Sequence, residues 1–307
     1  MGDWEAVIVG AGPAGLAAGT RLSRDGCRAI VLEKENFGGH LLNLERVKDH
    51  PGFPGGVAGT HLAAQMLKEA EDSGLELERG EAAEIELYTS RRWVQCKDGT
   101  GHCAPVVIIA GGLGPKRLGV PGEEELSGKG LFTCATCEGG LLADRVVAVC
   151  SAGDAGVADA LYLAQWAARV IVLDAMPSLC ASPGLRQQAV SNPKLEIRCG
   201  VRVEAIQGAG RVEAIDLLDQ AIGHKETLSV DGVLVNVGLE PNTGYLLNVV
   251  PLESHGRIVV NDRMETGVPG VLAAGDIRSG SSGLVVDAVN DAAVAALSAR
   301  SLIRASA

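Results

Sequence analysis

The stretch that decides the fold runs Ala6-Val7-Ile8-Val9-Gly10-Ala11-Gly12-Pro13-Ala14-Gly15, an apolar run followed by a glycine-rich turn. A helix-like stretch rich in Ala and Leu continues to Asp25, and a second apolar run, Ala29 to Glu33, ends in an acid. This succession predicts a strand, a helix and a parallel strand, because β-branched runs favour strands and the period of the apolar residues changes after the turn.

The glycines of this turn and the acid after it suit a dinucleotide. Gly10 permits the tight turn, Gly12 lets the backbone approach a pyrophosphate, and Gly15 allows close packing of the helix. The helix N-terminus stabilises phosphate charge, and Glu33 can accept hydrogen bonds from ribose hydroxyls. A lone GxGxxG pattern is weak evidence and can be a structural turn, but the strand before it and the acid after it make it specific. We therefore predict a dinucleotide site.

The same succession occurs a second time. The run Val146–Val149 precedes a turn from Ser151 to Gly156, a helix-like stretch near residues 157–167 follows, and Val170–Asp174 again ends in an acid. Two such units predict an α/β protein with two Rossmann-like domains of the FAD/NAD(P)-binding type. Trp166 lies beside Ala-rich helical positions, so we expect it in the core rather than against a cofactor.

Glycine and proline mark two places where the chain passes between these domains. One follows the apolar run Val106–Ile109, and the other lies at Gly238–Asn242. The second domain, residues 116–240, is therefore predicted to be inserted into a discontinuous first domain, residues 1–115 plus 241–307.

The charge balance limits the partners. The chain carries 27 Lys and Arg against 38 Asp and Glu, a net charge of −11, and none of its basic runs is longer than Arg91-Arg92. A nucleic-acid surface needs clustered cations, so we expect no nucleic acid. No apolar run approaches the roughly 18 residues of a membrane span, and the beginning lacks a signal-peptide pattern. We expect a cytoplasmic protein that acts on small molecules or other proteins, away from membranes.

One pair stands out among the eight cysteines. Cys134-Ala-Thr-Cys137 is followed directly by Glu138, whereas the other six are scattered singly. At a helix start, first-turn amides lower a thiol pKa, CxxC spacing suits a reversible disulfide, and an adjacent carboxylate can carry the proton that each thiol gains or loses. A zinc site would need a second ligand pair, and none is visible, so we predict no metal. A buried, inert pair is the plain alternative.

Six motifs together are specific for one superfamily: Gly10-Ala-Gly-Pro-Ala-Gly15, Gly38-Gly-His40, Pro51-Gly-Phe-Pro54, Cys134-Ala-Thr-Cys-Glu-Gly139, Gly238-Leu-Glu-Pro-Asn-Thr243 and Ala273-Ala-Gly-Asp276. The chain resembles the low-molecular-weight thioredoxin reductase family of flavoproteins from end to end. The resemblance implies FAD in the first domain, the CxxC pair in an inserted NAD(P)-type domain facing the flavin, and a homodimer.

The resemblance also implies roles for single residues. Cys134 would exchange with substrate, Cys137 would be the thiol closer to the flavin, and Glu138, replacing the usual aspartate of the family, would act as acid and base. By motif and resemblance, the cofactor-binding residues are Gly10, Gly12, Pro13, Ala14, Gly15, Glu33, Lys34, Gly39, His40, Leu42, Asp49, Ala83, Ala110, Gly111, Gly275, Asp276, Leu284 and Val285.

Several positions depart from the family. Ser151 stands where the second turn should have its first glycine, and Asp174-Ala-Met176 replaces the His-Arg-Arg cluster that clamps the 2′-phosphate of NADPH. A carboxylate would repel that phosphate, whereas it suits the free ribose hydroxyls of NADH. Gly283-Leu284 replaces an Arg-Gln pair, Asp49 replaces an asparagine near the flavin, and Gly111 replaces a threonine. The sequence therefore disfavours NADPH and leaves NADH open.

These departures favour a flavin-dependent dithiol oxidase, in a branch of the superfamily that does not use NADPH. A small dithiol would reduce the enzyme disulfide, and electrons would pass through FAD to dioxygen, as in the dithiol oxidases of gliotoxin and holomycin biosynthesis that the chain resembles. The alternative is a thioredoxin-disulfide reductase that uses NAD(P)H or ferredoxin. A third hypothesis is a non-catalytic flavin-binding protein, and the acid beside the CxxC pair argues against it.

Overall fold

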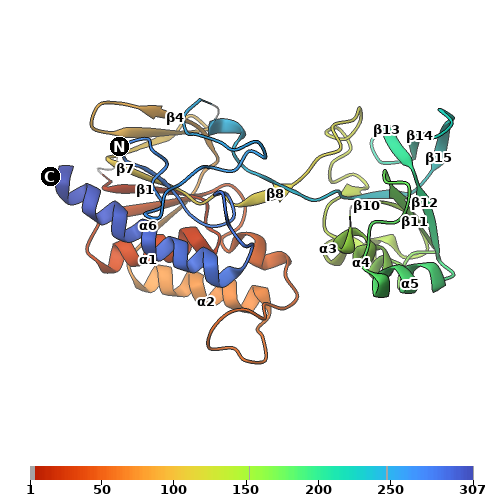
Figure 1. Cartoon of the computed structure of the whole chain (residues 1–307), viewed down its shortest axis with the longest axis horizontal. Coiled ribbons are helices and arrows are strands. Elements are labelled where there is room, and N and C mark those ends of the chain that lie inside the picture. Colours follow the sequence, from red (N-terminus) through yellow and green to blue (C-terminus); the bar gives the residue numbers. More distant parts are fainter. Residues whose placement is uncertain (1–3, 152, 247, 307) are drawn as a thin grey trace. The chain divides into compact units, whose positions relative to one another are not determined.

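The chain folds into two compact units that separate after Gly114 and again after Leu239. The computed structural model describes residues 4–151, 153–246 and 248–306. Unit 1 combines the first and last segments of the chain, and unit 2 is the segment between them (Figure 1). Each unit contains a five-stranded parallel sheet with helices, so the predicted α/β class with two Rossmann-like sheets is confirmed.

Unit 1 is built on the parallel sheet β18-β7-β1-β2-β3, in which Ala6 pairs with Ala29 and with Val106. Its elements are β1 Ala6–Val9, α1 Pro13–Arg24, β2 Ala29–Glu33, the 3-10 helix η1 Gly39–Asn43, α2 Gly59–Asp72, β3 Glu76–Arg79, β4 Ala82–Leu87, β5 Arg92–Cys96, β6 Gly101–Ala104, β7 Val106–Ile109, the 3-10 helix η3 Gly244–Leu246, β18 Val271–Ala273 and α6 Val285–Ser306. The connecting strands β8 Leu113–Pro115 and β17 Leu239–Pro241 form a two-stranded sheet of their own.

Both faces of the unit 1 sheet are covered, which explains why its central strands β1 and β7 are apolar and buried at every position. Ala6 and Ile8 of β1 join the core under α1 and α6. Val7 and Val9 point the other way, into the core shared with the antiparallel sheet β4-β5-β6. Figure 1 shows α1, α2 and α6 along one side of the sheet and β4 on the other. The carboxyl ends of β1 and β2 are thereby held rigidly beside the glycine-rich turn.

Unit 2 repeats this plan on the parallel sheet β12-β11-β10-β16-β9. Its elements are β9 Leu131–Phe132, α3 Ala135–Glu138, the 3-10 helix η2 Gly139–Leu142, β10 Val146–Ser151, α4 Asp154–Leu163, β11 Arg169–Asp174, α5 Pro183–Ser191, β12 Leu195–Cys199, β13 Val201–Gln207, β14 Ala214–Asp219, β15 Lys225–Ser229 and β16 Gly232–Asn236. Val147 and Val149 pack toward α4, and Ala148 and Cys150 pack toward the antiparallel sheet β13-β14-β15. The alternation is the same as in unit 1.

The expectation that Trp166 lies in the core is wrong. Its side chain is 46% exposed, because α4 ends at Leu163 and Trp166 lies in the turn beyond it. The predicted helix extended to residue 167, and the earlier end removes Trp166 from the buried helical face.

Candidate functional site

The first glycine-rich turn packs too tightly for larger residues. Gly10 has a φ of +103°, and a Cβ there would lie 2.5 Å from the carbonyl oxygen of Ala110. A Cβ on Gly15 would lie 1.8 Å from the carbonyl oxygen of Gly10. A Cβ on Gly12, in contrast, would have no other atom within 4 Å. The turn therefore closes against β7 and α1 and leaves open space at Gly12, as backbone approach by a pyrophosphate requires.

Glu33 ends β2 as a buried acid. Its Oε2 accepts a hydrogen bond from the Ala11 N–H at 2.8 Å, and its Oε1 accepts one from the Glu35 N–H at 2.9 Å. Each carboxylate oxygen keeps a further lone pair. Glu33 can thus fix the turn and still receive ribose hydroxyls.

A cavity of about 340 Å³ in unit 1 opens at this turn. The predicted residues that line it are Gly10, Glu33, Lys34, Ala83 and Gly111. Sequence reasoning missed Tyr245, which also lines the cavity and whose buried hydroxyl has no partner among the described residues. It also missed Asn242, whose side-chain amide donates to the Gly111 carbonyl at 2.7 Å. The open turn, the acid and the unpaired hydroxyl fit the nucleotide half of FAD.

Other predicted cofactor residues lie near the same turn or on it. Pro13, Ala14 and Gly15 begin α1, Ala110 and Gly111 follow β7, and Gly39, His40 and Leu42 are on η1. A Cβ on Gly39 would lie 2.9 Å from the Cα of Gly12, so η1 lies directly against the turn. His40 is exposed.

Three further predicted cofactor residues, Asp49, Leu284 and Val285, lie at the start of α6. The Asp49 carboxylate accepts hydrogen bonds from the N–H groups of Val285 at 2.8 Å and Val286 at 3.4 Å. Asp49 therefore caps a 22-residue helix from a loop more than 230 residues away in sequence, and its negative charge is favourable at that helix end. Leu284 is 45% exposed, immediately before this helix.

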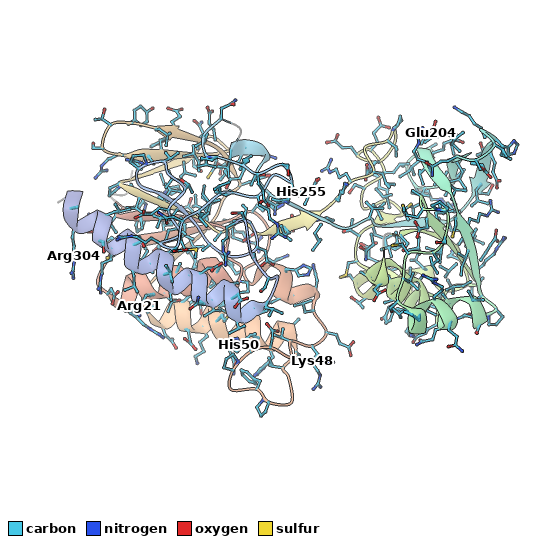
Figure 2. The ribbon with its side chains drawn as sticks, in the orientation of Figure 1. Arg21, Lys48, His50, Glu204, His255 and Arg304 are labelled. Carbon is cyan, nitrogen blue, oxygen red and sulfur yellow. A yellow bond between two sulfur atoms is a disulfide. The ribbon has the colours of Figure 1, made fainter. Side chains whose placement is uncertain are left out.

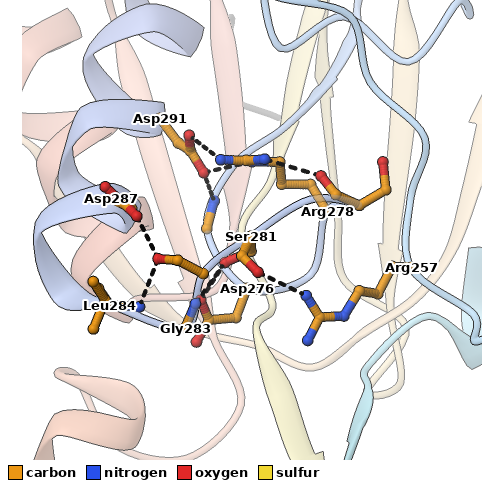
Figure 3. A network of polar contacts seen from close by, with 11 residues as sticks. Arg257, Asp276, Arg278, Ser281, Gly283, Leu284, Asp287 and Asp291 are labelled. Atoms are coloured by element: carbon orange, nitrogen blue, oxygen red, sulfur yellow. Dashed lines mark hydrogen bonds and ion pairs between the residues drawn. The ribbon is translucent and has the colours of Figure 1, made fainter.

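A polar network fixes the loop between β18 and α6 (Figure 3). Arg278 forms two hydrogen bonds of 2.7 Å with Asp291, which is 2% exposed and also accepts from the Gly275 N–H at 3.1 Å. Asp276 accepts from the Ser281 hydroxyl at 2.7 Å. The predicted residues Gly275 and Asp276 are thus held by residues that sequence reasoning did not single out.

In unit 2, Cys134 and Cys137 form a disulfide at the start of α3, as the CxxC spacing predicts. Cys134 is the N-cap of that helix, and its sulfur accepts a hydrogen bond from the Cys137 N–H at 3.2 Å. Cys134 is half-buried and Cys137 is exposed. A hydrogen bond to sulfur favours the thiolate form, so this arrangement favours negative charge on Cys134 after reduction.

Glu138 follows the pair directly and is half-buried. Burial raises the pKa of its carboxyl above the usual value. A carboxyl with a raised pKa can both give and take a proton closer to neutral pH, which general acid–base catalysis needs.

The second glycine-rich turn contains a serine whose packing depends on a neighbouring glycine. Ser151 replaces the expected glycine, and its side chain is 5% exposed. A Cβ on Gly156 would lie 2.4 Å from the Ser151 Oγ, so Gly156 gives the serine its space. Ala152, within this turn, lies outside the described residues.

This coupling predicts the outcome of a double substitution. Gly156→Ala is expected to lower the free energy of unfolding by about 1–3 kcal/mol, because the new methyl group overlaps the Ser151 side chain. Ser151→Gly in the same chain should remove part of that loss, because it removes the Oγ and Cβ atoms in contact but leaves the residue 151 Cα 2.9 Å from the new methyl group. Denaturant unfolding of the two single variants and the double variant measures the coupling free energy. Additive effects would mean that residues 151 and 156 do not pack against each other.

Within the part of the chain that the structure describes, no group of three or more His, Cys, Asp or Glu side chains lies close enough to hold a metal ion. In the same residues, no helix is long and apolar enough to cross a membrane.

Comparisons with known proteins show which family the chain belongs to. Residues 4–292 match the model of the family described as pyridine nucleotide-disulphide oxidoreductase. The thioredoxin reductase of Treponema pallidum is 33% identical over 98% of this chain and 97% of its own length, and that of Bacillus subtilis is 33% identical over 96% and 93%. The thioredoxin reductase structure from Lactococcus lactis has a TM-score of 0.84 at 27% identity, covering 99% of this chain and 100% of that one. The structure from T. acidophilum has a TM-score of 0.80 at 32% identity, covering 97% and 98%.

The chain therefore belongs to the pyridine nucleotide-disulphide oxidoreductase family. Within it, the protein is an FAD-dependent oxidoreductase of the thioredoxin reductase family that acts on disulfides. The relatives and solved structures named above are all thioredoxin reductases, so they favour the disulfide reductase alternative over the dithiol oxidase.

Proposed function

We propose that this protein reduces the disulfide of a thioredoxin-like protein, using FAD in unit 1 and the Cys134–Cys137 pair in unit 2. The observation that carries the proposal is the disulfide at the start of α3, in a chain that aligns with thioredoxin reductases over almost all of its length. The proposed setting is a cytoplasmic homodimer.

The reduced pair would act as follows. The Cys134 thiolate, favoured by the Cys137 N–H, attacks the substrate disulfide and forms a mixed disulfide. Cys137 then attacks Cys134, which restores the enzyme disulfide and releases the substrate as a dithiol. Glu138 moves the proton that one thiol must lose. FAD, held by the turn at Gly10 and by Glu33, supplies two-electron transfer to the disulfide when bound.

Direct reduction of thioredoxin tests this function. The FAD-loaded protein is reduced with dithionite without oxygen, freed from excess reductant and mixed with oxidised thioredoxin. New thiols on thioredoxin, with recovery of oxidised flavin absorbance, are the expected result. If thioredoxin keeps its disulfide, the proposed function fails.

Dithiol oxidation is the second candidate, supported by the residues after β11. Asp174, Ala175 and Met176 offer no cation for a 2′-phosphate, which disfavours NADPH as the electron donor. A small dithiol would then give two electrons and two protons, becoming a disulfide, and dioxygen would become hydrogen peroxide. Anaerobic bleaching of the flavin by dithiothreitol, followed by repeated turnover in air with matching oxygen uptake, would favour this candidate over thioredoxin reduction.

Glu138→Gln should slow disulfide exchange by about a hundredfold, because the amide cannot carry a proton. Burial raises the pKa of Glu138, so the rate of the unmodified protein should change as the pH crosses that raised value. This pH dependence should disappear in the variant. The matched control is Glu124→Gln, an exposed acid of the same unit. If the pH profile of Glu138→Gln keeps the shape of the unmodified protein's profile, Glu138 does not carry the proton.

A further inference from the structure

Two elements of unit 1 lie against the glycine-rich turn outside the cavity that fits the nucleotide half of FAD. A Cβ on Gly39 of η1 would lie 2.9 Å from the Cα of Gly12. A Cβ on Gly275, in the loop after β18, would lie 2.9 Å from the Cβ of Ala14. Neither element contributes a described residue to the lining of the cavity beside Glu33. Because a dinucleotide extends to both sides of its pyrophosphate, we expect the flavin half along these two elements.

Both elements lead to the start of α6. Leu41 of η1 and Val285 of α6 belong to one buried apolar cluster. The Gly275 N–H donates to the Asp291 carboxylate of α6 at 3.1 Å. The loop between η1 and α2 reaches the same place, because Asp49 in that loop accepts from the Val285 N–H at 2.8 Å. The first turn of α6 is therefore beside the expected path of the flavin half.

The residues on either side of Asp49 have different surroundings, and Figure 2 labels both of them. Lys48 is exposed, so water screens its charge. His50 packs against Phe53 with ring centroids 5.9 Å apart, and its Nδ1 is buried without a partner among the described residues. A bound polar group that pairs with such an atom is stabilised. This loop thus offers a cofactor a negative charge and an unpaired polar atom.

Asp49 occupies the part of α6 that would otherwise stabilise an anion. The first-turn N–H groups of a helix together carry roughly half an elementary positive charge. The Asp49 carboxylate accepts from two of them, Val285 and Val286, and adds a full negative charge. A flavin that has taken up two electrons is an anion at neutral pH, so a nearby carboxylate raises its free energy relative to oxidised flavin. The reduced flavin then gives up its electrons more readily.

We propose that Asp49 lowers the reduction potential of bound FAD and thereby favours electron transfer from the flavin to the Cys134–Cys137 disulfide. The direction of transfer rests on the proposed function, whereas the effect on the potential does not. In this step reduced flavin, FADH−, gives up two electrons and one proton and becomes FAD. With one further proton from water, the disulfide becomes two thiols.

The reduction potential of the FAD-loaded full chain tests the proposal. Asp49→Asn keeps a side-chain oxygen that can accept from the Val285 N–H, and it removes the charge. Anaerobic titration with dithionite beside a reference dye should give a flavin potential about 30 mV higher than in the unmodified protein, which is a tenfold shift toward reduced flavin. An unchanged or lower potential would overturn the proposal. Because no thioredoxin is present, a failure here is distinguishable from a failure of disulfide reduction.

Two further variants show whether the effect depends on place. Asp72→Asn is the matched control, because it removes the same charge from an exposed position at the end of α2 and should leave the potential unchanged. An equal rise in this control would contradict a specific role of Asp49. Leu284→Lys leaves Asp49 in place and adds a cation directly before α6, at a side chain that is 45% exposed. It should shift the same equilibrium at least about threefold toward reduced flavin. If Asp49→Asn does not retain FAD, an unchanged potential in Leu284→Lys overturns the proposal.

Discussion

Cys137→Ser is expected to abolish disulfide turnover, with a loss of roughly a thousandfold or more. The reason is covalent: without the second sulfur, the mixed disulfide on Cys134 cannot be resolved within the enzyme, and no electrons can pass through a Cys134–Cys137 disulfide. A stable complex with thioredoxin, released by added dithiol, should accumulate instead. Non-reducing electrophoresis and thiol release measure both effects.

Cys180→Ser is the matched control for this substitution. Cys180 is an exposed free thiol of the same unit, and its loss should leave turnover near that of the unmodified protein. Flavin content should be unchanged in both variants, because the proposed FAD residues are in unit 1. If Cys137→Ser keeps more than about a tenth of the turnover, the pair does not carry the reaction.

The fold was predictable because short-range signals in the sequence are tied to backbone geometry. The apolar runs of β1 and β10 are buried on both faces, and each leads into a glycine-rich turn. A Cβ on Gly10 would overlap the backbone of Ala110, so only glycine fits where the two backbone segments approach closely. The spacing from Cys134 to Cys137 likewise encodes a contact within one helical turn.

Features that depend on distant parts of the chain were not predictable. Asp49 caps α6 from a loop far away in sequence, and no spacing or periodicity relates the two. Tyr245 enters the unit 1 cavity from a 3-10 helix that lacks a recognisable motif. Ser151 was visible as a departure from the expected glycine, but its dependence on Gly156 appears only when both side-chain positions are known in space.

The ion pair between Arg278 and Asp291 was also not predictable from the sequence, and breaking it has the largest expected effect on stability. Arg278→Ala should lower the free energy of unfolding by about 3–5 kcal/mol, because it leaves a buried carboxylate without its cation. Asp291 is 2% exposed and Arg278 is 15% exposed, so water cannot replace the guanidinium easily. The shift of the denaturant midpoint relative to the unmodified protein measures the loss.

Two further variants separate this explanation from a general effect of losing an arginine. Arg263→Ala removes an exposed partner of Glu265, and the loss there should be at most about 1 kcal/mol. Arg278→Met combined with Asp291→Leu removes both charges and should recover much of the stability lost in Arg278→Ala. The Gly275 N–H loses its acceptor in that double variant, so recovery should be incomplete. A double variant as unstable as Arg278→Ala would mean that the network stabilises the loop through hydrogen-bond geometry rather than through charge neutralisation.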